Sequence, residues 1–294
     1  MTKENSMTRE NSKILISAAG GKVGQHVVTQ LAQKKVSARA GVHSQAKASA
    51  LRETGVDAAV LDFESPESIT AAFKGIDTLF LVTPGSPDQG RYEDNLLADA
   101  KRVGVKRIVK LSGKIAEHHT VGFSKWNREA EQKIKQSGIP YTILRGKFFM
   151  QNLFGSAAQI KQGAFTAGPA AKRIALLDAR DIAATAVATL TEEGHAGKTY
   201  DLNGPELLDG HAQAAVFSSV LGRPVRYLDV SAADFIGQLK SFGLPPWMVE
   251  AFGVAVADSE IPGDQSSAQI ERLLHRKPGT LAQFIKDYRA AFQA

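Results

Sequence analysis

The chain has 294 residues, of which 43% are hydrophobic, and it carries a formal net charge of +6 and no cysteine. This length is sufficient to bury the core of one large domain together with an additional lobe. The lack of cysteine excludes disulfide bonds, thiolate metal ligands and thiol nucleophiles, so any chemistry must come from other side chains.

The positive charge does not by itself indicate a nucleic-acid partner, because the basic residues are dispersed. The densest group, Lys101 to Lys110, fits a helix end followed by a strand. Residues 1–12 are polar and of mixed charge, which predicts a disordered N-terminus. No apolar run has the length of a signal core or a membrane span, so we expect a cytoplasmic protein without a membrane partner. Because the basic residues are dispersed, we also expect no nucleic-acid partner. A homodimer is compatible with this composition.

From residue 13 to residue 150, short apolar segments rich in β-branched residues alternate with helical segments. This alternation is typical of βαβ units, so we expect an α/β fold with a Rossmann-type, doubly wound parallel sheet. The segments in chain order are strand Ile14–Ile16, helix Val23–Gln33, strand Val36–Val42, helix Ala46–Thr54, strand Val56–Leu61, helix Pro66–Lys74, strand Ile76–Val82, helix Tyr92–Val103, strand Val105–Leu111, helix Trp126–Gln136 and strand Tyr141–Leu144.

Glycines mark the ends of the predicted helices. Gly55, Gly75, Gly104 and Gly138 each follow a helical segment, where a left-handed backbone is favoured. Ser65-Pro66 has the pattern of a helix N-terminus with proline at the first helical position. These positions support the predicted boundaries.

Beyond Gly146 the pattern becomes less regular, and we interpret residues 151–294 as a smaller C-terminal α/β lobe that closes over the sheet. Residues 173–202 are expected to return to the Rossmann core. The predicted elements are helix Gln151–Lys161, strand Arg173–Leu177, helix Ala179–Leu190, strand Lys198–Leu202, helices around Ala212–Leu221 and Ala232–Phe242, a break at Gly243–Trp247, and an amphipathic helix Thr280–Phe292. Asp178 and Asp181 are interpreted as acids at a helix N-terminus.

The first strand leads directly into a glycine-rich turn and a helix. Such a turn places backbone N–H groups and the positive end of the helix dipole against a diphosphate. Gly21 would let the backbone approach the phosphates, and Gly24 would let helix and strand pack closely. The spacing does not fit a P-loop, which disfavours nucleoside triphosphate hydrolysis. The alternative is a tight turn without a ligand. The predicted dinucleotide-binding turn comprises Ala18, Ala19, Gly20, Gly21, Lys22, Val23 and Gly24.

The end of the second strand indicates which dinucleotide is bound. NAD-binding folds usually place an acid there to bind the ribose 2′-hydroxyl, whereas this strand is followed by His43 and, one helical turn later, by Lys47. A 2′-phosphate would meet donors and no repelling carboxylate, so NADPH is favoured and NADH is the alternative. His43 could instead be an ordinary exposed loop residue.

The glycine-rich turn occurs together with four further motifs. In chain order the motifs are Ala-Ala-Gly-Gly-Lys-Val-Gly24, Asp62-Phe63, Leu81-Val-Thr-Pro84, Lys110-Leu-Ser-Gly113, and Ser137-Gly-Ile-Pro-Tyr-Thr-Ile-Leu-Arg145 leading to Phe148-Phe-Met-Gln-Asn152. With these motifs the chain resembles the NmrA-like family of atypical short-chain dehydrogenases/reductases. That family includes quinone reductases, triphenylmethane dye reductases and non-catalytic redox sensors.

The resemblance implies roles for individual positions. Asp62 and Phe63 would flank the adenine, and Thr83 and Pro84 would lie along the middle of the cofactor. The segment from Arg145 through Lys147 to Phe148 would border the nicotinamide. The first glycine of the family's motif is replaced by Ala18, which can make the turn only if its φ stays negative.

The chain lacks the Tyr-x-x-x-Lys pair with which short-chain dehydrogenases exchange a proton. If Glu131 is aligned with the glutamate that often follows this motif, the two motif positions become Phe123 and Asn127, neither of which titrates. Asn127 could instead bind the nicotinamide or its ribose. Ser112 ends the fifth strand where such enzymes keep a serine, so Ser112 and Asn127 are the candidate catalytic residues. A strand-end hydroxyl that satisfies a backbone group is the alternative for Ser112.

Two functions remain open. One is an NADPH-dependent reductase that transfers hydride directly to a conjugated acceptor such as a quinone or a dye. The other is a non-catalytic sensor of the NADP(H) pool. The histidines show no metal-binding spacing, so no metal is expected. A set of apolar residues could line a hydrophobic acceptor pocket, although core packing is the expected role of any single one of them. The set comprises Phe148, Phe149, Met150, Phe154, Phe242, Trp247 and Phe252.

Overall fold

The computed structural model describes residues 13–113, 122–146, 148–169, 171–257 and 267–293. The predicted polar segment of residues 1–12 lies outside them. The chain divides into two units. The first comprises Met1–Gly113, Lys125–Arg145 and Ile182–Asp201, and the second comprises Lys114–Ser124, Gly146–Asp181 and Leu202–Ala294.

The first unit is built on a seven-stranded sheet whose strand order reverses beside β1. In spatial order the strands are β3 (Asp57–Val60), β2 (Ala38–Val42), β1 (Ile14–Ile16), β4 (Thr78–Leu81), β5 (Arg107–Gly113), β6 (Tyr141–Gly146) and β9 (Lys198–Asp201). Leu15 pairs in parallel with Arg39 of β2 and with Leu79 of β4, so the predicted parallel Rossmann-type sheet is confirmed.

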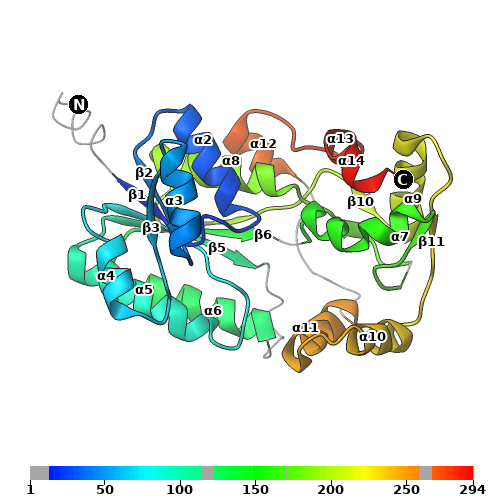
Figure 1. Ribbon diagram of the computed structural model, residues 1–294, viewed down its shortest axis with the longest axis horizontal. Helices are drawn as coiled ribbons and strands as arrows, with labels where there is room; N and C mark the ends of the chain where they lie inside the picture. The colour runs from blue at the N-terminus through cyan, green and yellow to red at the C-terminus, as the bar shows by residue number, and fades with distance from the viewer. Residues whose placement is uncertain (1–12, 114–121, 147, 170, 258–266, 294) are drawn as a thin grey trace. The chain divides into compact units, whose positions relative to one another are not determined.

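Helices cover both sides of this sheet (Figure 1). One side carries α2 (Gly24–Gln33), α3 (Gln45–Glu53) and α8 (Ala179–Thr191), and the other carries α4 (Pro66–Ala72), α5 (Gln89–Val103) and α6 (Gly122–Lys135). A cluster of buried side chains that includes Leu15, Phe73, Leu96 and Ile108 forms a core of this unit. Burial on both faces explains why the strands are apolar at successive positions rather than alternately.

The local signals for helix ends are confirmed in this unit. Gly55, Gly75, Gly104 and Gly138 all have positive φ, between 72° and 84°. The Ser65 hydroxyl accepts a hydrogen bond from the Ser68 amide at the start of α4, ahead of a proline in the first turn. A capping serine therefore marks the start of α4, and glycines with positive φ follow the ends of α3, α4, α5 and α6.

The second unit combines helices with two small sheets. Strand β10 (Leu207–Leu208) pairs antiparallel with β8 (Ile174–Ala175), and β11 (Arg226–Tyr227) pairs in parallel with β7 (Ala164–Phe165). Its helices are η1 (Met150–Ser156), α7 (Ala157–Lys161), α9 (Gly210–Leu221), α10 (Ala232–Ser241), α11 (Pro246–Ala257), α12 (Ala268–Leu274), α13 (Leu281–Asp287) and α14 (Arg289–Phe292). The predicted break at Gly243–Trp247 is wrong in its second half, since Pro246 begins α11.

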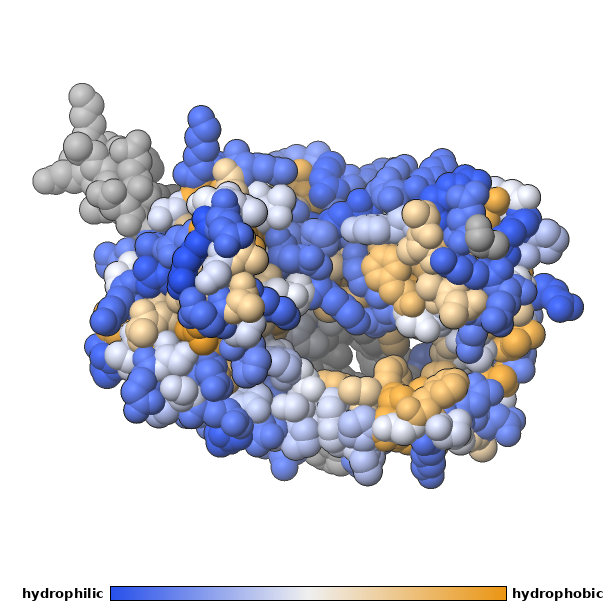
Figure 2. Space-filling view, viewed as in Figure 1, coloured by the Kyte–Doolittle hydropathy of each residue, from blue (hydrophilic) through white to orange (hydrophobic). Residues whose placement is uncertain are grey.

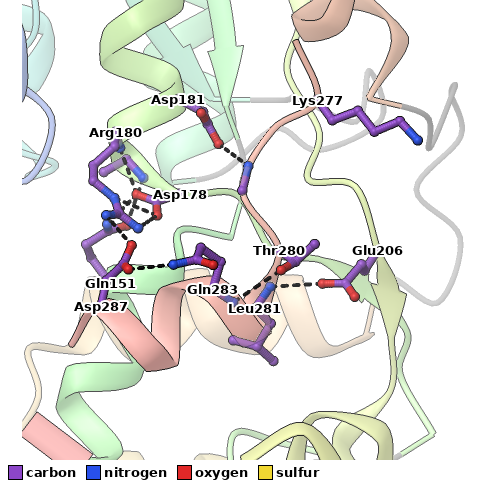
Figure 3. A network of polar contacts seen from close by, with 12 residues as sticks. Gln151, Asp178, Arg180, Asp181, Glu206, Lys277, Thr280, Leu281, Gln283 and Asp287 are labelled. Carbon is purple, nitrogen blue, oxygen red and sulfur yellow. Dashed lines mark hydrogen bonds and ion pairs between the residues drawn. The ribbon is translucent and has the colours of Figure 1, made fainter. Parts of the chain in front are cut away.

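A polar network joins the C-terminal segment to the start of α8 in the second unit (Figure 3). The Asp178 carboxylate accepts hydrogen bonds from the Arg180 backbone and from Gln151, which confirms its predicted capping role. Asp181 also binds a distant segment, because it accepts a hydrogen bond from the Gly279 amide at 2.7 Å. The chain around residues 277–287 is therefore fixed by buried carboxylates.

His195 gives the first unit a testable pH dependence. Its Nδ1 lies 2.9 Å from the Tyr200 hydroxyl. Burial lowers the pKa of His195 below its ordinary value of 6.5; the charges of Lys198 and Arg107 also lower it, and Glu192 opposes them. A depressed histidine pKa means that the folded state binds the proton less well than the unfolded state. The resulting stabilisation is complete above pH 6.5 and is lost as the pH falls below that value.

We expect His195→Gln to reduce the pH dependence of stability. A glutamine side chain can also form a hydrogen bond with the Tyr200 hydroxyl, in either direction, but it does not titrate. The free energy of unfolding, measured in urea from about pH 8 to about pH 5, should fall less steeply in the variant than in the wild type. Equal slopes for the two proteins would show that His195 does not contribute.

Candidate functional site

The glycine-rich turn between β1 and α2 is closed by local backbone hydrogen bonds. The Gly21 amide donates to the Ala18 carbonyl at 3.0 Å, and the Ala19 amide donates to the Gly41 carbonyl of β2 at 2.9 Å. Ala18 is not among the described residues with positive φ. It therefore meets the condition under which an alanine can replace the first glycine of the motif.

Gly24 lies where the first turn of α2 passes closest to the chain leaving β1. A Cβ atom at Gly24 would be 2.1 Å from the Ala18 carbonyl oxygen, whereas one at Gly20 would meet nothing within 4 Å. This geometry confirms that Gly24 permits close packing of helix and strand. Gly24 is therefore required for packing, whereas Gly20 lies beside open space.

The N-terminus of α2 offers donors without competing acceptors. Within the described part of the chain, no group accepts a hydrogen bond from the Gly20, Val23 or Gly24 amide. Val23 supplies no side-chain cap, and the first turn of α2 contains no acidic residue. An anion placed here would find backbone N–H groups and the positive end of the helix dipole.

The end of β2 carries the residues predicted to select the cofactor. His43 is exposed, and Ser44 caps α3 by accepting a hydrogen bond from the Lys47 amide. Gly20 and Lys47 border one hollow between α2 and α3. No acidic residue occurs between Ala38 and Ala50, so no carboxylate of this segment would repel a 2′-phosphate.

Asp62 and Phe63 follow β3 in an ordered turn. The Asp62 carboxylate accepts a hydrogen bond from the Glu64 amide, and the Phe63 carbonyl accepts one from Asn95. The Phe63 ring packs on Tyr92 with a centroid distance of 5.5 Å. Both predicted residues are half-buried.

Thr83 belongs to a buried polar cluster that the sequence did not predict. Glu93 Oε1 accepts hydrogen bonds from the Thr83 hydroxyl at 2.7 Å, from Gln89 Nε2 at 3.0 Å and from Lys110 Nζ at 2.8 Å. Gln89 Nε2 also donates to Asn127 Oδ1 at 3.2 Å. Thr83 is half-buried and the other four side chains are buried, and Pro84 lies exposed next to Thr83. The cluster places Thr83 and Asn127, two predicted site residues, in one network.

Ser112 belongs to a second buried cluster, centred on Glu131. The Ser112 hydroxyl donates to Glu131 Oε1 at 2.7 Å, and Arg145 Nε donates to the same oxygen at 2.9 Å. Arg145 Nη2 contacts Glu131 Oε2 at 2.5 Å. The Ser112 hydroxyl thus satisfies a carboxylate rather than a backbone group, which differs from the alternative considered for it.

The remaining predicted positions follow β6. Lys147 lies outside the described residues, and Phe148 belongs to the second unit. Phe148 has a φ of 49°, which is unusual for a bulky residue and costs about 1–3 kcal/mol. Strain of this kind persists only where surrounding contacts hold it, and here the Phe148 carbonyl accepts a hydrogen bond from the Leu177 amide.

The second unit contains an apolar cavity of about 450 Å³, a volume typical of small-molecule sites. Figure 2 shows hydrophobic side chains on both sides of a hollow in this unit, over α7 and over α10 and α11. Phe148, Phe149, Phe242 and Phe252 line the cavity as predicted. The polar side chains that line it are Asn152, Ser156, Gln159, Thr166, Lys172, Gln213, Tyr227 and Gln238.

Three of the predicted lining residues lie elsewhere. Met150 is 1% exposed inside the core of the second unit. Phe154 packs on Phe284, Tyr288 and Phe292, and Trp247 packs edge-on against Phe123. Core packing accounts for Met150, whereas Phe154 is 37% exposed and belongs to an aromatic cluster outside the cavity. An apolar stripe in sequence does not distinguish a core from a pocket.

Two features are absent from the described residues. No helix among them is long and apolar enough to cross a membrane. No group of three or more histidine or carboxylate side chains is placed to hold a metal ion in the same part of the chain.

Comparison with known proteins identifies the family. The model of the NmrA-like family matches residues 10–285. The chain belongs to the NmrA-like family. This membership agrees with the motifs that follow the strands of the first unit.

Similar family members are reductases by name. An NAD(P)H azoreductase of Xenophilus azovorans is 34% identical over 286 residues, which cover 96% of this chain and 99% of the relative. Quinone oxidoreductase 2 of Escherichia coli is 30% identical and covers 92% of this chain and 97% of the relative. The structure of an NADPH complex of the E. coli NADPH-dependent quinone oxidoreductase aligns with a TM-score of 0.82 and 29% identity, covering 94% of this chain and 99% of that one.

We expect Gly24→Ala to destabilise this NmrA-like protein by about 2–3 kcal/mol, because the added methyl meets backbone atoms that cannot move aside. Gly20→Ala is the matched control, since its methyl meets open space. Its effect should stay within about 0.5 kcal/mol. Urea unfolding of both variants tests this difference, and similar stabilities would contradict the close approach at Gly24.

Proposed function

We propose that this chain is an NADPH-dependent oxidoreductase that reduces an aromatic, conjugated acceptor such as a quinone or an azo dye. The observation that carries the proposal is the turn from Ala18 to Gly24, which leaves backbone amides without acceptors at the start of α2. Relatives named as NAD(P)H azoreductase and quinone oxidoreductase support the same conclusion.

A dinucleotide fits the residues present. The Gly20, Val23 and Gly24 amides would bind the diphosphate, and the open space at Gly20 admits it without displacing a side chain. His43 and Lys47 would bind a 2′-phosphate where no carboxylate repels it. Asp62 and Phe63 would flank the adenine, and Thr83, Pro84, Asn127 and the segment from Arg145 to Phe148 would border the nicotinamide half.

The bound cofactor would supply a hydride, and the protein would supply orientation and an apolar surface for the acceptor. Ser112 and Asn127 each bind a buried partner, Glu131 and Gln89 respectively, so we assign them to holding the cofactor site rather than to proton transfer. The proton that completes reduction of a quinone would come from solvent. The cavity of the second unit would bind the acceptor's rings.

A non-catalytic NADP(H) sensor is the second candidate. One observation favours it: the two candidate catalytic side chains, Ser112 and Asn127, do not titrate near neutral pH. A sensor would need the dinucleotide site but no acceptor.

Turnover distinguishes the two functions. Oxidation of NADPH, followed by its absorbance, should accelerate when naphthoquinones or azo dyes are added to the purified protein. A reductase gives saturable rates, whereas a sensor binds NADPH and NADP⁺ without turnover on any acceptor. Binding without turnover would reject the reductase.

A cavity variant provides the control for this assay. Phe242 lines the cavity and is 67% exposed, so Phe242→Ala should raise the acceptor KM by about threefold to tenfold with little loss of stability. Leu228 is 49% exposed and does not line the cavity, so Leu228→Ala should leave KM unchanged. An identical KM in both variants would place the acceptor elsewhere.

Cofactor preference is tested at His43. The substitution His43→Asp places a negative charge where the 2′-phosphate is expected, so it should weaken NADPH by about tenfold or more and NADH by much less. Dissociation constants from the fluorescence of the reduced cofactors provide the measurement. Equal weakening of both cofactors would remove the assignment of this site to the 2′-phosphate.

A further inference from the structure

Glu93 is the centre of a buried cluster in which the direction of each hydrogen bond can be assigned. Glu93 and Lys110 are 4% and 1% exposed, and the Lys110 ammonium also donates to the Leu111 carbonyl at 2.7 Å. The Lys110 ammonium lies 2.8 Å from Glu93 Oε1 and can only donate, so this oxygen accepts the hydrogen bond.

This acceptor determines what its neighbours offer. The Thr83 hydroxyl gives its hydrogen to Glu93, so its oxygen is left as an acceptor. Gln89 must turn its Nε2 toward Glu93, and the same nitrogen donates to Asn127 Oδ1. Asn127 is therefore fixed with its oxygen toward Gln89 and its nitrogen on the opposite side. That nitrogen lies near Gly113, 3.5 Å from where a Cβ of Gly113 would be.

We propose that Glu93 is the positioning residue of the cofactor site, because it makes Thr83 an acceptor and turns the donor end of Asn127 away from Gln89. This inference rests on the proposed function. A ligand group that is both donor and acceptor, with an NH₂ beside a carbonyl, is complementary to this pair. The carboxamide of nicotinamide has this chemistry, and Glu93 acts on it only through Thr83 and Gln89.

Only one of the two carboxylate oxygens of Glu93, Oε1, accepts hydrogen bonds from the described residues. A substitution can therefore keep this acceptor while it removes the negative charge. Among the described residues nothing donates to Glu93 Oε2. In Glu93→Gln, the donors around Oε1 require the amide oxygen to stay at that position, so the NH₂ occupies the place of Oε2. The directions of the hydrogen bonds are then preserved without the charge.

Two double variants differ only in this acceptor. Both carry Lys110→Met, which removes the cation that would otherwise be buried without a partner. The first adds Glu93→Gln and keeps the acceptor, and the second adds Glu93→Met and removes it. Thermal unfolding checks that both fold.

The measurement is the affinity of each protein for NADPH and for adenosine 2′,5′-bisphosphate, which lacks the nicotinamide half. The variant with Glu93→Met should lose about tenfold in NADPH affinity and should bind the bisphosphate like the wild type. The variant with Glu93→Gln should stay within about threefold of the wild type for both ligands. This pattern supports Glu93 as a positioning residue.

Other results would overturn either the role of Glu93 or the proposed function. Wild-type affinity for NADPH in the Glu93→Met variant, or an equal loss of both ligands, would overturn the inference while leaving the proposed function in place. A wild-type protein that binds neither ligand would overturn the proposed function itself. If the Glu93→Met variant does not fold, Gln89→Leu replaces it, because this change disconnects Asn127 and leaves the pair of Glu93 and Lys110 intact. The same loss confined to NADPH is then expected, and its absence would overturn the inference.

Discussion

The close approach of Gly24 to Ala18 is the constraint on which the first unit depends. A side chain at Gly24 would occupy the position of the Ala18 carbonyl, so only glycine lets α2 begin directly behind β1. The same lack of side chains leaves the turn's amides accessible. Packing and the proposed anion site are therefore two results of one requirement, and a loss of Gly24 would affect both.

Two buried carboxylates organise the polar side chains along the neighbouring strands β4, β5 and β6. Glu93 binds Thr83, Gln89 and Lys110, and Glu131 binds Ser112 and Arg145. Buried charges of this kind are costly unless they are paired, and here each carboxylate has a cationic partner. The polar groups beside the proposed nicotinamide site are thus held in fixed orientations, which suits a site that aligns reactants rather than one that exchanges protons.

The sequence predicted the first unit well because its signals are local. Apolar runs and glycines at helix ends gave strands and helices close to those observed, such as β1 at Ile14–Ile16 and α2 at Gly24–Gln33. The second unit was harder to predict from the sequence. Its helix α11 lacks a distinct polar face, so the helical pattern of apolar and polar residues is weak. Its strands of two residues are too short to show the alternation typical of a strand. The cluster at Glu93 was missed because Lys110, a lysine between apolar neighbours in β5, binds a partner on another element, α5. The i,i+4 spacing of Gln89 and Glu93 was a signal of a shared helix face, but not of what that face meets.

The chain passes between the two units after residues 113, 124, 145, 181 and 201. Neither unit is therefore one continuous piece of polypeptide, although a boundary near residue 150 looks natural in the sequence. A fragment ending there would lack β9, so β6, which pairs with β9 in the full chain, would become an edge strand. Ribosomal synthesis must likewise deliver residues up to 201 before the seven-stranded sheet can close, so much of the second unit's chain emerges before the first unit is finished.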